Sequence, residues 1–255
     1  MSFSNPIPDI DDEIKDVNEV NQSDYTSLNG VYFAFIDVLG FKKTFDDIKV
    51  SNENEIANKY RDVFNYYFSL MNVAKFMDKD KNSHCYAGQT SDSLYFYTQR
   101  PDYLMQFIKI FSHFSLYAMS KNVFFRGGIA KGTIYQKEQY QFYGDCIIGA
   151  YLLESNISKN PIVVIDKKTD EDMKKISGYE ELIDTYQDRK YIKPFEFLDK
   201  KNVLDIDEGF KVRDIDRIEI EKNILKNKEA FEYDPSNYAK YVFLLDQFEK
   251  SNNNV

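Results

Sequence analysis

The sequence has no tryptophan, only two cysteines, and no long run of apolar residues. Cys85 and Cys146 lie far apart, outside any Cys-x-x-Cys or Cys/His cluster, so neither a disulfide framework nor a structural zinc site is indicated. No stretch approaches the ~18 apolar residues that span a bilayer. The acidic N-terminus also lacks the basic start and apolar centre of a secretory signal. We therefore expect a cytoplasmic protein that does not enter a membrane.

Positive charge is also scarce, since 33 basic residues face 42 acidic ones and the net charge is -9. This balance argues against a nucleic-acid partner or an acidic membrane surface, although a local basic pocket for a phosphate ligand remains compatible with it. The sequence contains no Walker loop, no dinucleotide fingerprint and no Ser/His/Asp set. The two histidines, His84 and His113, are interpreted as structural residues rather than general bases.

The 255 residues are enough for one main domain with additions. We expect a flexible N-terminal arm over residues 1–28, a catalytic core over 29–166, and a mainly helical extension over 167–255 that packs on the core.

Residues 31–41 read Val-Tyr-Phe-Ala-Phe-Ile-Asp-Val-Leu-Gly-Phe. The six apolar or aromatic residues at the start, bounded by Gly30 and Gly40, predict a short strand that is buried on both faces. Asp37 follows where this strand runs out. An acid at that place is costly to bury unless it is paired or binds a metal. Taken alone, Asp37 is equally readable as a turn or capping residue.

The periodicity after this strand predicts an α/β (α+β) fold. Apolar positions at three- and four-residue spacing indicate helices, and alternating positions indicate a hairpin with Ser91 and Asp92 near its tip. The expected order is a helix over 52–77, hairpin strands over 84–89 and 92–98, a helix over 101–120, a strand over 123–135, a helix over 144–158 and a strand over 161–165. This order is typical of ferredoxin-like or palm domains, in which helices flank a mostly antiparallel sheet.

The composition of the C-terminal part is different. Charge-rich stretches over 167–186 and 216–231 are interpreted as helical, residues 191–198 as a further strand, and residues 238–248 as a docking helix.

Two acids stand out against this fold. In a palm-type sheet the first strand and the hairpin are neighbours, so Asp37 and Asp92 can face one small volume. Two carboxylates that close repel each other unless divalent cations lie between them. Oxygen ligands of this kind suit Mg²⁺ or Mn²⁺, and a two-metal arrangement suits phosphoryl transfer.

Four motifs in this order resemble those of the class III nucleotidyl cyclases. Residues 35–41, Phe-Ile-Asp-Val-Leu-Gly-Phe, resemble their first metal motif, and the Ser-Asp-Ser of 91–93 is similar to their second metal turn. Residues 126–132, Arg-Gly-Gly-Ile-Ala-Lys-Gly, resemble the strand that follows. The next helix is matched by Tyr143, Gly144, Ile147, Ala150, Leu153 and Glu154.

In detail the sequence is similar to one branch of that family, the pyrimidine (uridylate or cytidylate) cyclases of the bacterial Pycsar anti-phage systems. The branch features an Asp-Val-Leu-Gly-Phe-Lys box, a Ser-Asp-Ser turn, an Arg-Gly-Gly-Ile strand, and a helix from Gly to Ala-Tyr-x-Leu-Glu. Residues 37–42, 91–93, 126–129 and 144–154 match these elements, and residues 240–244 resemble the branch's closing helix.

The resemblance implies a function and a set of site residues. Asp37, Asp92 and the backbone carbonyl of Val38 would bind two Mg²⁺ or Mn²⁺ ions. Backbone amides of Leu39, Gly40 and Phe41, with the charge of Lys42, would hold the triphosphate of UTP or CTP. The product would be 3′,5′-cyclic UMP or cyclic CMP, released with pyrophosphate as a messenger for a separate effector. The family also implies a homodimer with its sites at the subunit interface.

The sequence departs from the purine cyclases at several positions. Their helical Asn and Arg, which stabilise the transition state, are matched by Ile148 and Leu152, so Arg126 and Lys131 become the nearest candidates for that role. Arg126 is equally readable as a structural ion-pair partner. The two base-reading positions hold Gly88 and Gln141. Gln141 is our candidate donor to a pyrimidine carbonyl, and the simpler interpretation of the same residue is a glutamine that faces solvent.

Two other functions were weighed. A cyclase-like fold that has lost catalysis and binds nucleotides or proteins remains an alternative, because Ile148, Leu152 and Ile162 depart from the family pattern. A haloacid-dehalogenase-type phosphatase would need a second Asp two residues after Asp37, where Leu39 stands.

Overall fold

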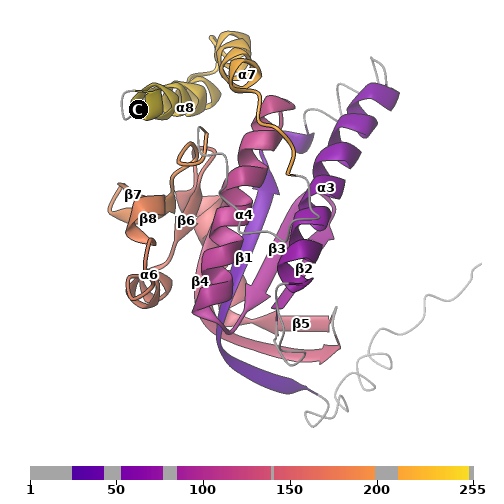
Figure 1. The fold of residues 1–255 in the computed structure, drawn as a ribbon, viewed down its shortest axis with the longest axis vertical. Coiled ribbons are helices and arrows are strands. Elements are labelled where there is room, and N and C mark those ends of the chain that lie inside the picture. Colours follow the sequence, from indigo (N-terminus) through magenta and orange to yellow (C-terminus); the bar gives the residue numbers. More distant parts are fainter. Residues whose placement is uncertain (1–24, 43–52, 77–84, 139–140, 199–211, 253–255) are drawn as a thin grey trace, which may run out of the picture.

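A computed structural model describes residues 25–42, 53–76, 85–138, 141–198 and 212–252. Its elements, in chain order, are β1 (Thr26–Val38), α3 (Glu53–Phe76), β2 (Cys85–Thr90), β3 (Ser93–Thr98), α4 (Pro101–Ser120), β4 (Phe125–Glu138), β5 (Gln141–Gly144), α5 (Asp145–Leu152), the π-helical turn η2 (Leu153–Ile157), β6 (Val163–Ile165), α6 (Lys167–Met173), the 3₁₀ turn η3 (Glu180–Leu182), β7 (Ile183–Tyr186), β8 (Arg189–Ile192), α7 (Arg217–Ala230) and α8 (Pro235–Asn252). Figure 1 shows their arrangement.

The strands form a single sheet in the order β2-β3-β1-β4-β6-β8-β7, and β5 pairs with the far end of β4. Strand β1 is antiparallel to both β3 and β4, and β2 is antiparallel to β3. Together with α3 and α4 this is the β-α-β-β-α-β order of a ferredoxin-like fold. The predicted fold class, a mixed α/β domain with a mostly antiparallel sheet flanked by helices, is confirmed. Among the strands in the described ranges, only β4 and β6 pair in parallel.

Both faces of β1 are covered, as its unbroken apolar sequence predicted. Tyr32, Ala34 and Ile36 belong to a large apolar cluster on the face that carries α3 and α4. Val31 and Phe33 alternate with them and belong to a second cluster on the face that carries α5. We call these the α3/α4 face and the α5 face.

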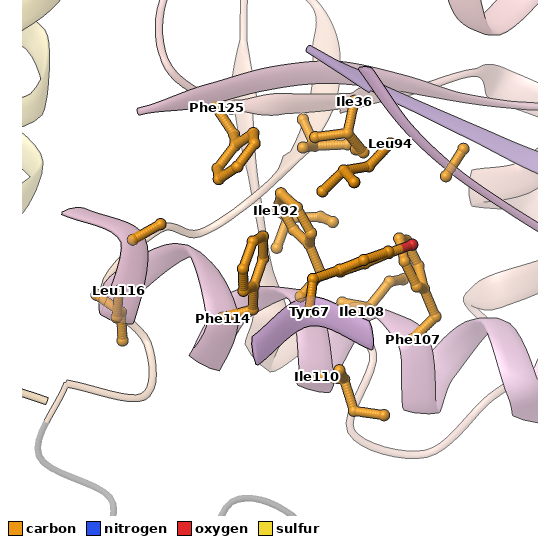
Figure 2. Packing of buried hydrophobic residues seen from close by; sticks show 14 of the residues in the cluster. Ile36, Tyr67, Leu94, Phe107, Ile108, Ile110, Phe114, Leu116, Phe125 and Ile192 are labelled. Atoms are coloured by element: carbon orange, nitrogen blue, oxygen red, sulfur yellow. The ribbon is translucent and has the colours of Figure 1, made fainter. Parts of the chain in front are cut away.

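Aromatic and aliphatic side chains of α3 and α4 fill the α3/α4 face. Figure 2 shows Tyr67 and Phe114 rising from the helices toward Ile36, Leu94 and Phe125 of the strands. Each fully buried side chain of this size contributes about 1.5–3 kcal/mol relative to an exposed one. The tyrosine and phenylalanine stripes of the two predicted helices are therefore core.

The C-terminal part differs from its predicted secondary structure. The helix predicted over 167–186 ends at Met173, and Ile183–Tyr186 is instead strand β7. Strand β8, predicted over 191–198, covers only Arg189–Ile192, and the two strands join through Gln187 and Asp188, which have positive φ values of 48° and 60°. Helices α7 and α8 form where helices were predicted. The sheet therefore continues beyond residue 166.

The N-terminal arm predicted over 1–28 lies outside the described residues up to residue 24, and Thr26, Ser27 and Leu28 belong to β1. The domain boundaries at 28 and 166 stay predictions. Within the part of the chain that is described, no helix combines the length and apolar content that a membrane crossing requires.

Candidate active site

Three polar side chains from adjacent strands meet in one row at the end of β1. Asp37 is paired with Ser93 of β3 on one side and with Arg126 of β4 on the other. Because side chains alternate along strands, all three point to the α5 face. Ser93 Oγ donates a hydrogen bond to Asp37 Oδ1 at 3.1 Å, and Arg126 Nη2 lies 3.9 Å from Asp37 Oδ2.

Asp92 joins this row from the turn between β2 and β3. Ser91 has a positive φ of 56°, which is the left-handed backbone of a tight turn, and Asp92 follows it as predicted. Burial raises the pKa of Asp37, and the negative charge of Asp92 raises it further. Hydrogen bonds from Ser93 and from the Val38 amide, with the charge of Arg126, act in the opposite direction. Asp92 is therefore close enough to Asp37 to disfavour the charged form of Asp37.

Glu154, at the start of η2, is a third acid of this site to which the sequence reasoning gave no role. Its side chain is only 4% exposed, and Oε1 lies 2.7 Å from Arg126 Nη2. Burial raises the pKa of Glu154 although Arg126 opposes the shift. The signal was present in the sequence, because Glu154 is an acid within an apolar helical stretch, as costly to bury as Asp37.

The contact between Arg126 and Glu154 leaves polar atoms unused. Glu154 Oε1 and Arg126 Nε are buried without a hydrogen-bond partner, although Oε1 forms the ion pair with Arg126 Nη2. Unsatisfied buried groups are rare in native proteins and call for an explanation. Arg126 was predicted to be either a charge stabiliser or a structural ion-pair partner. The structure contains the ion pair, which Arg126 forms with Glu154, and the same guanidinium also lies near Asp37.

Lys131, the other candidate for a charge stabiliser, lies elsewhere. It is paired with Tyr32 five positions farther along the two strands, and its ammonium contacts Asp172 of α6. The structure therefore does not bring Lys131 to Asp37.

The residues predicted to hold a triphosphate follow β1 directly. Gly40 has a φ of +76°, a conformation that glycine adopts without strain, and Phe41 packs its ring at 5.1 Å from that of Tyr60. The amide of Leu39 donates to the carbonyl of Phe124 at 2.8 Å, so it would have to exchange this partner to bind a phosphate. Lys42 is exposed.

The two positions predicted to read the base are in different surroundings. A Cβ at Gly88 would come within 2.2 Å of the Tyr95 ring, so the tyrosine occupies the space that a longer side chain would need. Gln141 begins β5, which pairs with the end of β4 farthest from Arg126. The ring of the next residue, Phe142, packs 5.4 Å from the ring of Tyr95, which pairs with Phe35 two residues before Asp37. Figure 1 shows β5 at the opposite end of the sheet from α7 and α8.

The donor set fits a hard divalent cation. Two carboxylates, Asp37 and Asp92, with the nearby carbonyl of Val38, offer the oxygen ligands that Mg²⁺ and Mn²⁺ prefer, and a cation would relieve the mutual effect of the acids. Over the described ranges, no group of three or more His, Cys, Asp or Glu side chains is placed to hold a metal. A cation here would therefore need water or substrate oxygens to complete its shell.

The described histidine, His113, does not belong to this site. His113 is buried in α4 and shares a 2.9 Å hydrogen bond with the hydroxyl of Tyr66, as expected for a structural histidine. His84 lies outside the described residues.

Comparisons with known proteins give structural neighbours but no sequence relatives. No protein-family model matches the chain, and no curated protein matches it. The monomeric guanylyl cyclase domain of the RhoGC fusion protein from the aquatic fungus Blastocladiella emersonii is similar in structure, with 16% identity and a TM-score of 0.44, covering 66% of this chain and 95% of that one. The catalytic core of a rhodopsin-guanylyl cyclase with converted specificity, in complex with ATPalphaS, has 14% identity and a TM-score of 0.44, covering 66% of this chain and 96% of that one.

Proposed function

We propose that this chain is a nucleotidyl cyclase that converts UTP or CTP to the 3′,5′-cyclic nucleotide and pyrophosphate. The observation that carries the proposal is the meeting of Asp37 and Asp92 at the end of β1 in a ferredoxin-like sheet, where the charge of Asp92 raises the pKa of Asp37. The order of motifs that resembles the class III cyclases supports the same reading.

In this proposal the protein positions the substrate and compensates charge. Asp37, Asp92 and the carbonyl of Val38 hold two Mg²⁺ or Mn²⁺ ions, which supply Lewis-acid stabilisation to the phosphate chain. Residues Leu39 to Lys42 face the triphosphate. The ribose 3′-oxygen attacks the α-phosphorus, the bond from that phosphorus to the β-phosphate oxygen breaks, and the hydroxyl proton passes to solvent.

A homodimer with shared sites belongs to the proposal. Gln141 pairs with the end of β4 opposite Arg126, and we infer that it contacts the base bound at the site of a second copy. Helix α5 also presents three exposed apolar side chains at helical spacing, Ile148, Tyr151 and Leu152, with exposures of 61%, 52% and 46%. An apolar face of this kind, next to the row of site residues, suits contact with a second copy.

The pyrimidine preference and the defence role follow from the resemblance to the Pycsar branch. Gly88 has no side chain that could contact a purine, and the Tyr95 ring fills the space beside it. The cyclic product would act on a separate effector protein during phage infection.

The test is incubation of the purified full chain with Mn²⁺ and each of the four nucleoside triphosphates, with chromatographic separation and mass identification of the products. We expect a cyclic pyrimidine nucleotide. Absence of any cyclic product, also after addition of extract from phage-infected cells, would refute the enzyme and leave a nucleotide-binding or protein-binding module.

Variants of Asp37 and Asp92 test whether these two acids are the metal ligands. Asp37→Asn and Asp92→Asn should each abolish turnover, whereas the surface variant Asp246→Asn, which removes a carboxylate from an exposed ion pair with Lys250, should keep it. Substantial turnover by either site variant would refute the metal assignment.

A further inference from the structure

Helix α8 touches both faces of the sheet near the candidate site. Tyr241, Leu244 and Phe248 belong to the apolar cluster of the α3/α4 face. Phe243 instead packs against Tyr186 and Tyr191 in the cluster of the α5 face. Because residues three and four apart on a helix are neighbours, Lys240 lies between Phe243 and Leu244, where the contacts of α8 with the two faces meet. The α5 face is the face that carries Asp37, Arg126 and Glu154.

A short series of contacts joins Lys240 to the strand ends that carry the site. The ring of Tyr241, the next residue, lies 5.2 Å from the ring of Phe124. The carbonyl of Phe124 accepts the 2.8 Å hydrogen bond from the Leu39 amide. Leu39 stands two residues after Asp37, and Phe124 two residues before Arg126. The first half of α8 is therefore seated where β1 ends and β4 begins.

Positive charges gather at this place. Burial lowers the pKa of Lys240, the charge of Arg126 lowers it further, and Lys159 also lowers it, while Asp234 acts in the opposite direction. Glu154 pairs with Arg126, so that cation is compensated by a buried anion. Lys240 has a neutral partner, since its ammonium donates to Asn237 Oδ1 at 2.7 Å, and Lys159 Nζ donates to the carbonyl of Ser155 at 2.8 Å.

Like charges that converge repel one another, and the repulsion is relieved when an anion binds between them. A second observation also points to a ligand. Arg126 Nε is a buried donor without a hydrogen-bond partner, and phosphate oxygens are acceptors that guanidinium groups bind strongly.

We propose that Arg126, Lys159 and Lys240 form the phosphate-binding side of the active site, and that Lys240 supplies the positive charge that helix α5 lacks. This inference rests on the proposed cyclase function and adds a residue to it. Ile148 and Leu152 cannot stabilise charge, so the negative charge that develops on the phosphate oxygens in the transition state needs another cation. Lys240 brings it from α8, far along the chain from the metal acids.

The test uses pyrophosphate, which carries the proposed ligand chemistry without a base or ribose. Binding to the full chain is measured by calorimetry without divalent metal, for the wild type, Lys240→Gln, Lys240→Arg and Lys250→Gln. The last is the matched control, because it removes one positive charge from an exposed position on the same helix. We expect Lys240→Gln to weaken binding about 10-fold, Lys240→Arg to retain it, and Lys250→Gln to bind as the wild type does. Equal affinity of Lys240→Gln and Lys250→Gln would overturn the proposal.

Turnover separates this inference from the cyclase proposal. If the wild type makes a cyclic nucleotide, Lys240→Gln should lower kcat about 100-fold, the range seen when one charge-stabilising donor is removed, with Lys240→Arg restoring most of it. Normal turnover by Lys240→Gln would overturn the role of Lys240 and leave the cyclase intact. If no triphosphate is cyclised but Lys240→Gln still loses pyrophosphate affinity, the anion site stands and the cyclase fails. Equal melting temperatures of the three variants confirm that the fold is unchanged.

Discussion

At the scale of single residues, Asp37 occupies a position that opposes its own ionisation. Its side chain is 23% exposed, its pKa is raised by burial and by Asp92, and the guanidinium of Arg126 is shared with Glu154. An acid whose pKa is raised in the folded state stabilises the fold only at low pH, and this contribution is lost as pH rises through the folded pKa. At neutral pH the ionised Asp37 therefore destabilises the folded state, and a bound cation can offset this destabilisation.

We accordingly predict that Asp37→Asn stabilises the metal-free protein at pH 7, by about 1 kcal/mol. Thermal unfolding in a chelator measures this, and addition of Mn²⁺ should raise the melting temperature of the wild type but not of the variant. Asp246→Asn serves as the control for loss of a surface carboxylate. A variant less stable than the wild type in the chelator would contradict the prediction.

The sequence predicts part of this site and leaves the rest open for physical reasons. Asp37 and Asp92 are predictable neighbours, because a hairpin beside the first strand brings its tip to the end of that strand. The ion pair of Arg126 with Glu154 is not predictable from the sequence, because it depends on how the π-helical turn η2 directs Glu154 back over β4. Lys131 was a reasonable candidate by position, but alternation along β4 leaves it with Asp172 instead.

At the scale of elements, α5 lies against β4 at a glycine. A Cβ at Gly128 would come within 2.3 Å of the carbonyl oxygen of Ala150 and 2.5 Å of Leu153 Cβ, so the backbones of helix and strand pack without an intervening side chain. This close approach sets the position of η2, and with it the position of Glu154.

Gly128→Ala should therefore destabilise the protein by about 2–3 kcal/mol through overpacking. Gly149→Ala is the matched change on the helix side, where the new Cβ would meet only Ala130 Cβ at 3.1 Å, and it should cost little. Urea unfolding of the two variants compares them directly. Similar midpoints would show that the strand and helix can separate without cost.

A second element-scale contact attaches the segment before α7 to α3 and α4. The Tyr66 hydroxyl accepts a 3.1 Å hydrogen bond from the backbone amide of Arg213 and shares another hydrogen bond with His113. The Arg213 guanidinium pairs with Asp62 at 2.8 Å. Burial lowers the pKa of His113 to about 4. The histidine is thus neutral in the fold at pH values where the unfolded chain already protonates it.

This difference predicts a pH dependence of stability. A depressed histidine pKa gives stability that is fully present above the unfolded value of about 6.5 and is lost as pH falls toward 4, by up to about 1.4 kcal/mol per pH unit. Urea unfolding from pH 7 to pH 5 measures the slope. His113→Gln should flatten the dependence, and an unchanged slope in that variant would assign it to other groups.

The helices over the sheet are predictable because long amphipathic patterns survive in any tertiary context. The β7–β8 hairpin is not predictable in this way, because its strands are short and charged and depend on the pairing of β8 with β6. In that pairing Val164 lies opposite Tyr191 and Ile165 opposite Lys190. Tertiary pairing overrides the weak helical preference of the sequence there.

At the scale of the whole molecule, the sheet separates two groups of functional candidates. Asp37, Asp92 and Arg126 lie at one end, and Gln141 lies with β5 at the other. In a two-fold dimer each end can meet the opposite end of its partner, which gives two equal sites.

This arrangement predicts complementation between inactive chains. Asp37→Asn and Gln141→Ala should each be inactive alone, whereas an equal mixture should regain about one quarter of the wild-type activity, because half of the dimers are mixed and each has one intact site. Turnover after exchange of subunits measures it, and the double variant Ile148→Asp, Leu152→Asp should be monomeric by light scattering. No recovery from a mixture shown to contain mixed dimers would refute the shared site.

The seating of α8 also bears on how cells handle unfinished copies of this protein. Tyr241, Leu244 and Phe248 complete the same apolar cluster as Tyr32 and Ile36 of β1, the first described strand. A ribosome that stops before this helix would release a polypeptide that contains both Asp37 and Asp92 but exposes the part of the apolar cluster that α8 covers. We expect quality-control proteases to clear such fragments, so that incomplete translation leads to degradation.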